Sequence, residues 1–415
     1  MKDHAIETAT LTAPERSDLM RQLSANAGPA DRGSIGLASE IGALSRAGAL
    51  VACLPFTAGG EGLGLDADSV VAAFELLRDM GRANLSVARL FEGHLNAAKL
   101  LHLYGGSSVA ERAFAAVRDG ALLGVWAADG ACPLRYGRAG RHLRLDGEKI
   151  FASGLGLVRF AVVSLRAEGT DRSCPDLAIV DVSDSARQDP SAWNATGMRA
   201  TVSGRFDFTG LEIDPAALIG QPGDYEREPH YEGGTWRYCA AQLGGAEALV
   251  ELWRSDLAAR GRLDDPLQLA RYARAVSLCR AMAHLVRETG MTVETSATGS
   301  AARIDAAVAD ALLTQQFVEE SCMEVLRLAE RSLGTAGYAS GSPIERIRRD
   351  LSLFLRQAAP DAKLLKGRVG CSPPHAHGDA VRQRDARPAS GMCCADRYRD
   401  AGRAGRRTRA GATSR

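Results

Sequence analysis

Hydrophobic residues change their spacing twice along this chain of 415 residues. Up to Gly120 they recur every three or four positions, which is the period of an amphipathic helix. Between Ala121 and Gly220 they form short alternating runs, which predict strands with one buried face. Beyond Tyr225 the helical period returns in longer stretches. The pattern predicts an α+β fold with an N-terminal α-helical domain (1–120), a middle β-barrel or sandwich domain (121–225) and a C-terminal four-helix bundle (226–366).

Local signals place the ends of several predicted elements. Thr12-Ala-Pro-Glu15 has the capping-box pattern of a helix start. Asp265-Pro266 opens a later helix, and Gly334 ends the one after it. Asp146-Gly147 predicts a tight hairpin, because glycine readily adopts positive φ. Further helices are expected over 39–50, 67–82, 85–104, 109–118 and 343–357, with strands near 143–145, 160–163, 177–180, 206–208 and 211–213.

The end of the chain, 367–415, differs from the rest. From residue 371 onward, Val381 is the only branched aliphatic side chain, and arginine, alanine and glycine dominate. Such a composition buries too little apolar surface to offset the entropy of ordering. We expect this tail to be disordered, and it has the character of a frameshifted, non-native end; an RNA-binding basic tail is the alternative.

The composition of the remaining chain narrows the possible functions. Hydrophobic residues make up 46% and charged residues 24%, which is typical of a globular enzyme. Residues 1–370 carry 41 basic and 46 acidic side chains, a balance that does not indicate nucleic-acid binding. The six cysteines before residue 370 form no CxxC pair, so neither a metal site nor a disulfide framework is predicted. Without an export signal or a long apolar run, we expect a cytoplasmic protein that does not enter the membrane.

A glycine-rich segment from Leu54 to Leu65 does not have the spacing of a dinucleotide-binding loop. Leu65 stands where GxGxxG would need a glycine, and no βαβ pattern follows. We interpret this segment as a turn within the N-terminal helical domain.

Three separated segments carry the strongest functional signal. They are Leu145-Asp-Gly-Glu-Lys-Ile-Phe-Ala-Ser-Gly154, Thr196-Gly-Met-Arg-Ala-Thr-Val-Ser203, and Gly334-Thr-Ala-Gly-Tyr338 with Arg349-Asp350 behind it. In this order and spacing they resemble the acyl-CoA dehydrogenase family, over roughly residues 15–365. The resemblance implies FAD held non-covalently between a small β domain and a helical bundle, in a homodimer or homotetramer.

The resemblance also implies which residues contact the flavin ring. Phe151 takes the position of the aromatic residue that covers one face of the isoalloxazine, and Ser153 that of the hydroxyl residue at its polar edge. Ala127 stands where the family has a threonine, so only main-chain groups could serve there. A plain core role for Phe151 and a capping role for Ser153 are the alternatives.

The other half of the cofactor would be approached across a subunit interface. The turn that contains Gly334, Thr335 and Gly337 resembles the family's glycine turn beside the adenosine half. Arg331 replaces the family's glutamine and could pair with phosphate. Arg260 falls where the family has an arginine on the pyrophosphate, with a surface arginine as the alternative.

The family's catalytic glutamate is missing at its usual position, which is Ala358 in this chain. In acyl-CoA dehydrogenases that carboxylate removes the α-proton of an acyl thioester, on CoA or a carrier protein, while hydride passes to flavin and on to an electron acceptor. Some members place the glutamate on the first helix of the C-terminal domain, near Thr235 here. Glu232 is therefore the candidate base, and Asp361 is a second one.

Two further hypotheses follow from the missing base. Relatives with the same fold are flavin monooxygenases that receive reduced flavin from a reductase partner and lack the glutamate. They use a polar group beside the flavin, often a histidine of the N-terminal helices, and His94 is the candidate; a histidine buried by packing is the alternative. The third hypothesis is a flavin- or substrate-binding protein that has lost catalysis.

Overall fold

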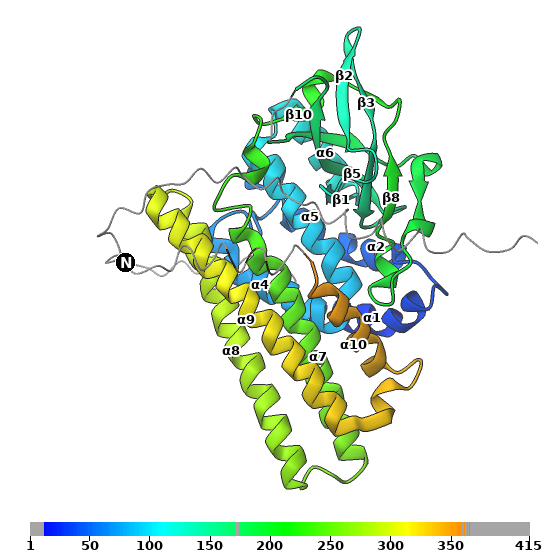
Figure 1. Ribbon diagram of the computed structural model, residues 1–415, viewed down its shortest axis with the longest axis vertical. Coiled ribbons are helices and arrows are strands. Elements are labelled where there is room, and N and C mark those ends of the chain that lie inside the picture. Colours follow the sequence, from blue (N-terminus) through cyan, green and yellow to red (C-terminus); the bar gives the residue numbers. More distant parts are fainter. Residues whose placement is uncertain (1–11, 171–173, 358–360, 362, 364, 366–415) are drawn as a thin grey trace, which may run out of the picture.

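The computed structural model describes residues 12–170 and 174–357, together with Asp361, Lys363 and Leu365. A helical N-terminal region, a middle β region and a C-terminal helical bundle follow one another along these residues (Figure 1). The α+β fold class predicted from the sequence is therefore confirmed. Ala358 and the tail 367–415 lie outside the described residues.

The N-terminal region contains six α-helices. Thr12 and Glu15 form the predicted capping box at the first of them, and Asn84 caps the longest one by accepting from the N–H groups of Ser86 and Val87. The predicted helix over 39–50 is interrupted at Gly48, which adopts φ 73°. The helices are α1 (Ala13–Asp31), α2 (Ala38–Arg46), α3 (Ala49–Ala52), α4 (Val70–Ala83), α5 (Leu85–Tyr104) and α6 (Ser107–Arg118).

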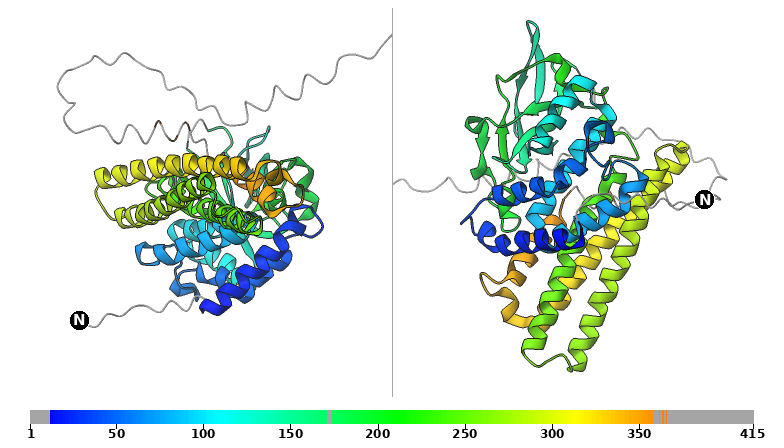
Figure 2. Two further views of the ribbon diagram at one scale, coloured as in Figure 1. Left: turned by 90° about the horizontal axis from the view of Figure 1, so that it is seen from below. Right: turned by 180° about the vertical axis from the view of Figure 1, so that it is seen from behind.

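Over the described residues from 226 to 357, the C-terminal region contains four α-helices, the number predicted for the bundle. Asp265 caps the second by accepting from two main-chain amides, and Gly334 ends the third with φ 60°. The helices are α7 (Trp236–Ala259), α8 (Pro266–Ser296), α9 (Ala301–Leu333) and α10 (Pro343–Phe354). Helix α7 lies between the N-terminal helices and the α8–α9 pair (Figure 2).

The middle region forms two sheets. The larger has the strand order β10-β6-β5-β2-β3-β9, with β1 added in parallel to β5, and the smaller has the order β4-β8-β7. Helix α5 packs against β1 and thus joins the β region to the bundle (Figure 1). The strands are β1 (Leu122–Trp126), β2 (Arg135–Ala139), β3 (His142–Asp146), β4 (Glu148–Ala152), β5 (Val158–Ala167), β6 (Asp176–Asp181), β7 (Gln188–Asp189), β8 (Gly204–Asp207), β9 (Glu212–Ile213) and β10 (Leu218–Ile219).

The hairpin predicted at Asp146-Gly147 is wrong. Strand β3 pairs with β2 and β9, whereas β4 pairs with β8, so the chain passes from one sheet to the other at this point. Gly147 does adopt φ 117°, but the reason is packing: a Cβ there would lie 2.6 Å from the carbonyl oxygen of Pro133. The tight hairpin forms instead between β2 and β3.

Two glycines allow the N-terminal region to pack closely against the bundle. A Cβ on Gly81 of α4 would lie 2.1 Å from the carbonyl oxygen of Ala241, and one on Gly244 of α7 would lie 2.0 Å from that of Arg78. The two backbones therefore meet without intervening side chains. This contact sets the position of α7, whose first turn forms part of the site described next.

Candidate functional site

The structure brings together parts of all three segments that carried the functional signal, and the second of them contacts both of the others. The amide of Met198 donates to Asp350 Oδ1 at 2.6 Å, and a Cβ on Gly197 would meet the carbonyl oxygen of Arg349 at 2.3 Å. Burial raises the pKa of Asp350 to about 6, although the Met198 amide opposes this shift. The segment 196–203 therefore packs directly against α10, which carries the Arg349-Asp350 part of the third segment.

Asp31, at the end of α1, strengthens the same junction. Its carboxylate accepts from Arg199 at 2.8 Å and from Arg349 at 2.7 Å. Burial acts to raise the pKa of Asp31, but the hydrogen bonds and charges of the two arginines outweigh it and hold the pKa at about 2. Three distant parts of the chain are therefore joined by one buried carboxylate.

Phe151 is presented on the surface of the β region in an unusual conformation. It is 49% exposed and has φ 53°, a left-handed conformation that costs a non-glycine residue about 1–2 kcal/mol. Its ring meets that of Trp193 edge to face, with centroids 6.4 Å apart. An exposed aromatic face held by strained backbone is suited to stacking on a planar ligand, so Phe151 fits a flavin ring.

Three hydroxyl groups form a chain that ends at Ser153. Thr201 Oγ1 donates its single hydrogen to the carbonyl oxygen of Met198 at 2.8 Å. The 2.7 Å contact between Thr201 and Ser203 therefore uses the hydrogen of Ser203, and the 2.8 Å contact between Ser203 and Ser153 uses that of Ser153. The Phe151 carbonyl, at 3.5 Å, is the poorer acceptor for Ser153. Ser153 Oγ is thus left as an acceptor toward any further partner.

A buried lysine positions the loop after β1. Lys149 Nζ donates to the carbonyl oxygen of Ala127 at 3.0 Å and to Asp129 Oδ1 at 2.6 Å, and Ser164 also donates to that carbonyl. The indole N–H of Trp126 donates to the carbonyl oxygen of Ser153 at 3.1 Å. The end of β1 is therefore linked to β4, and Ala127 and Ser153 belong to one neighbourhood. The positioning role of Lys149 was not predicted from the sequence.

A cavity of about 140 Å³ lies beside this neighbourhood, between α5, β1 and the start of α7. Val125 of β1, two residues before Ala127 in the chain, lines it. Glu92, Lys99, Arg237 and Lys363 are among the other lining residues. The cavity therefore combines an apolar strand, aromatic side chains and several charged groups.

The candidate base Glu232 lies behind the wall of this cavity. Its carboxylate is 9% exposed and forms an ion pair with Lys363, with Oε2 and Nζ 3.1 Å apart. Lys363 itself lines the cavity and also donates to Tyr238. The second candidate, Asp361, is exposed. The catalytic role of either carboxylate remains a prediction.

His94 is completely buried, and both of its ring nitrogens have main-chain partners. The amide of Leu123 donates to Nδ1 at 3.1 Å, so the proton resides on Nε2, which donates to the carbonyl oxygen of Leu50 at 2.9 Å. Burial lowers its pKa to about 4, so the ring is neutral at neutral pH. His94 is not among the residues that line the cavity. This geometry corresponds to the alternative of a structural histidine, and its catalytic role remains a prediction.

The residues expected beside the other half of the cofactor lie in the helical bundle, whereas Phe151 lies in the β region. The turn between α7 and α8 and the 3₁₀ segment Gly334–Tyr338 are both at the end of the bundle opposite the β region (Figure 1). Arg260, Arg331 and Thr335 are exposed there, and Arg260 pairs with Asp256. This arrangement does not support contact between these residues, or Gly334 and Gly337, and a flavin bound to the same chain. Their role across a subunit interface remains a prediction.

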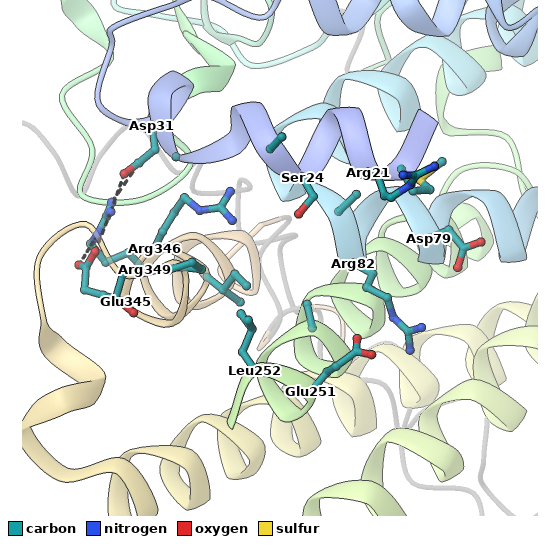
Figure 3. Close-up of a pocket in the computed structure, with 18 of the residues that line it drawn as sticks. Arg21, Ser24, Asp31, Asp79, Arg82, Glu251, Leu252, Glu345, Arg346 and Arg349 are labelled. Carbon is teal, nitrogen blue, oxygen red and sulfur yellow. Dashed lines mark hydrogen bonds and ion pairs between the residues drawn. The ribbon is translucent and has the colours of Figure 1, made fainter. Parts of the chain in front are cut away.

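A larger groove, of about 1140 Å³, lies between α1, α4, α7 and α10 (Figure 3). Its walls carry ion pairs that join the helices, among them those of Asp31 and the pair between Arg16 and Asp79 at 2.6 Å. None of the predicted site residues is among the described residues that line it. We interpret this groove as the seam between the helical regions rather than as the reaction site.

The described residues contain no group of three or more possible metal ligands, and none of the described helices is long and apolar enough to cross a membrane. The arrangement of N-terminal helices, two middle sheets and a C-terminal helical bundle is that of the acyl-CoA dehydrogenase fold.

Comparison with known proteins agrees with this class. Residues 237–356 match the family model "Acyl-CoA dehydrogenase, C-terminal domain". No curated protein sequence matches the chain. The bundle therefore belongs to the acyl-CoA dehydrogenase superfamily, and the resemblance inferred from the sequence is confirmed.

Solved structures of low sequence identity extend the likeness in fold to most of the chain. FMN-bound TdsC, a dibenzothiophene monooxygenase from Paenibacillus sp. A11-2, has a TM-score of 0.73 and 19% identity, covering 85% of this chain and 94% of TdsC. Methanesulfinate monooxygenase MsuC from Pseudomonas fluorescens has a TM-score of 0.73 and 19% identity, covering 86% and 95%. The nitrososynthase from Micromonospora carbonacea var. africana has a TM-score of 0.74 and 19% identity, covering 86% and 97%.

Proposed function

We propose that this chain is a flavin-dependent monooxygenase that receives reduced flavin, in the form of FMN, from a separate reductase. This is the second of the three hypotheses drawn from the sequence. Solved structures of similar fold include monooxygenases and an FMN complex, which supports this hypothesis over FAD-dependent desaturation of an acyl thioester.

The observation that carries the proposal is the pairing of the carboxylates around the cavity. Glu92 accepts from Arg89 at 2.6 Å, Asp224 pairs with Arg227 at 2.7 Å, and Glu232 pairs with Lys363. A base that removes an α-proton needs an unpaired carboxylate of raised pKa, since a neighbouring cation stabilises its ionised form. Both carboxylates among the described residues that line the cavity, Glu92 and Asp224, have an arginine as partner, and position 358 is an alanine.

The hydroxyl chain gives a second reason. Reduced flavin carries an N–H at N5, whereas the oxidised ring presents a bare acceptor nitrogen there. An acceptor-only Ser153 at the polar edge would therefore favour the reduced form. Phe151 would cover one ring face, and main-chain groups near Ala127 would complete the edge contacts.

Bound reduced flavin would supply two electrons to O₂, with one oxygen atom entering the substrate and the other leaving as water. The chain's own part is to hold the ring against Phe151, to accept a hydrogen bond at Ser153 and to exclude water. A second subunit would bring Arg260, Arg331 and the turn of Gly334, Thr335 and Gly337 toward the phosphate.

Anaerobic titration followed by oxygen measurement tests the proposal. We expect reduced FMN to bind more tightly than oxidised FMN, and the protein to change the rate of O₂ consumption from that of free reduced FMN and flavin reductase measured without it. Bleaching of a bound yellow flavin by an acyl-CoA would instead establish the dehydrogenase. A protein that binds neither flavin would leave only the non-catalytic hypothesis.

A further inference from the structure

The charged groups around the cavity are paired one to one except at a single place. Glu92 has Arg89, Asp224 has Arg227, and Lys363 has Glu232 as partner of opposite sign. The remaining cations of the wall, Lys99 and Arg237, share one carboxylate. In these ion pairs the described wall and its partners therefore carry one more cation than carboxylates, and Asp66 acts on Lys99 only through its charge, from beyond ion-pair distance.

That shared carboxylate belongs to Glu294 of α8. Its Oε1 accepts from Arg237 Nη2 at 2.7 Å and its Oε2 contacts Lys99 Nζ. Lys99 and Arg237 are each only 2% exposed and Glu294 7%. Burial and the charge of Arg237 lower the pKa of Lys99 to about 8, yet it stays mostly protonated at neutral pH. Two buried cations with one anion are an unfavourable arrangement that a ligand anion would relieve.

Polar atoms without a partner mark where such an anion would bind. Arg237 Nε and His230 Nδ1 are both buried and make no hydrogen bond within the described residues. Nδ1 of His230 lies 3.9 Å from Glu294 Oε2, beyond hydrogen-bonding distance. Burial, with the charge of Lys99, lowers the pKa of His230 to about 4, so the ring adds no charge at neutral pH. The surroundings of Lys99, Arg237 and His230 therefore combine one net positive charge in their ion pairs with polar atoms that make no hydrogen bond.

We propose that this cavity recognises its substrate through a single carboxylate bound by Lys99, Arg237 and His230. The inference rests on the proposed function, because it takes the cavity as the substrate site. One excess charge matches a carboxylate better than a phosphate dianion. The rest of the wall includes Tyr104, Val125 and Tyr231, and the cavity measures about 140 Å³. The acid therefore has a compact, apolar or aromatic body.

Isothermal titration of the flavin-free protein with matched acids and amides tests the site directly. The probes are acetate, cyclopentanecarboxylate and benzoate, each compared with its neutral amide. We expect at least one acid to bind wild type, and its amide to bind about tenfold or more weakly, since the amide carries no charge for Lys99 and Arg237. The inference is overturned if no acid binds at millimolar concentration, or if acid and amide bind alike.

Charge-changing variants distinguish recognition of an acid by Lys99 and Arg237 from a purely structural role of the triad Lys99, Arg237 and Glu294, because the two cases predict opposite effects. R237Q and K99M should weaken acid binding about ten- to a hundredfold, whereas R237K should retain most of it. E294Q adds a second uncompensated positive charge and should tighten acid binding roughly threefold or more. If E294Q weakens binding as much as R237Q does, in protein that circular dichroism shows to be folded, the triad is structural and the inference fails.

A matched control and a separate assay keep the two proposals distinguishable. R254Q removes an exposed arginine from the same helix and should leave acid binding unchanged. Oxygen consumption with reduced FMN, after subtraction of the protein-free rate, reports on the monooxygenase independently of the acid. Acid-selective binding without oxygen consumption would retain the carboxylate site and reject the proposed function, and the reverse result would reject the site alone.

Discussion

Replacement of Ser203 by alanine should reverse the hydrogen-bonding character of Ser153. In wild type the hydrogen of Ser153 is taken up by Ser203, which itself donates to Thr201. Without the Ser203 hydroxyl, Ser153 can turn its hydrogen toward the flavin and donate to the acceptor nitrogen of the oxidised ring. The substitution removes one small hydroxyl that is 6% exposed, so we expect the fold to be retained.

The magnitude follows from one hydrogen bond whose direction changes. A net hydrogen bond contributes about 0.5–1.5 kcal/mol, so the ratio of the dissociation constants of oxidised and reduced FMN should fall about tenfold. For a two-electron couple, about 1.4 kcal/mol corresponds to about 30 mV. The oxidised form gains relative stability in the variant, so the reduction potential of bound flavin should become more negative by about that amount.

Anaerobic fluorescence titrations with both redox forms of FMN, and a dye-equilibrated potential, measure this change. T201V should act in the same direction, because it frees the hydrogen of Ser203 for Ser153. S183A, which removes an exposed hydroxyl bound to Asp181, is the control and should change nothing. Folded S203A and T201V proteins with wild-type affinity ratios and potentials would refute the assignment of Ser153 as an acceptor at the flavin.

Three further changes test other parts of the structure. F151A should weaken flavin binding roughly tenfold without lowering the free energy of unfolding, because the ring is 49% exposed and aromatic stacking contributes about 0.5–1.5 kcal/mol; a loss of thermal stability with unchanged flavin affinity would contradict this. G244A should destabilise the protein by about 1–3 kcal/mol or more in urea unfolding, since its Cβ would lie 2.0 Å from the carbonyl oxygen of Arg78; G36A, where an added Cβ meets no atom and φ lies outside the left-handed region, is the control for glycine replacement. Because Asp31 has a folded pKa of about 2 against an ordinary 3.8, its contribution to the free energy of unfolding should be present above pH 4 and be lost as the pH falls toward 2. The D31N variant should therefore lose less stability than wild type over this pH range. An unchanged loss of stability at acid pH would argue against the two ion pairs of Asp31.

Much of the fold was predictable because it depends on local and periodic signals. The capping box at Thr12, the cap at Asp265 and the glycine that ends α9 act on neighbouring amides, so a short stretch of sequence contains their whole cause. Helix α5 begins and ends where the sequence pattern placed it, at Leu85 and Tyr104. The resemblance to the acyl-CoA dehydrogenases likewise depends on ordered motifs that can be recognised in the chain itself.

Strand pairing was not predictable in the same way, because it joins residues that are far apart in the sequence. Asp146-Gly147 has the composition of a hairpin, yet tertiary packing against Pro133 gives Gly147 a different use. The sheet order follows from which faces become buried, and a local turn signal contains no information about that. The prediction failed because positive φ at Gly147 is compatible both with a hairpin and with the observed passage from one sheet to the other.

By itself, the sequence determined the order of helical, β and helical regions and the positions of Phe151 near the end of one strand and Ser153 directly after it, because these depend on side-chain period and on motif. Only the tertiary structure decided that Lys99, Arg237 and Glu294, from three different helices, share one buried site. It likewise decided that Ser153 is an acceptor, since this follows from a chain of contacts with Ser203 and Thr201. The physical reason is the same in both cases: charge balance and hydrogen-bond direction belong to groups in contact, and the sequence does not specify those contacts residue by residue.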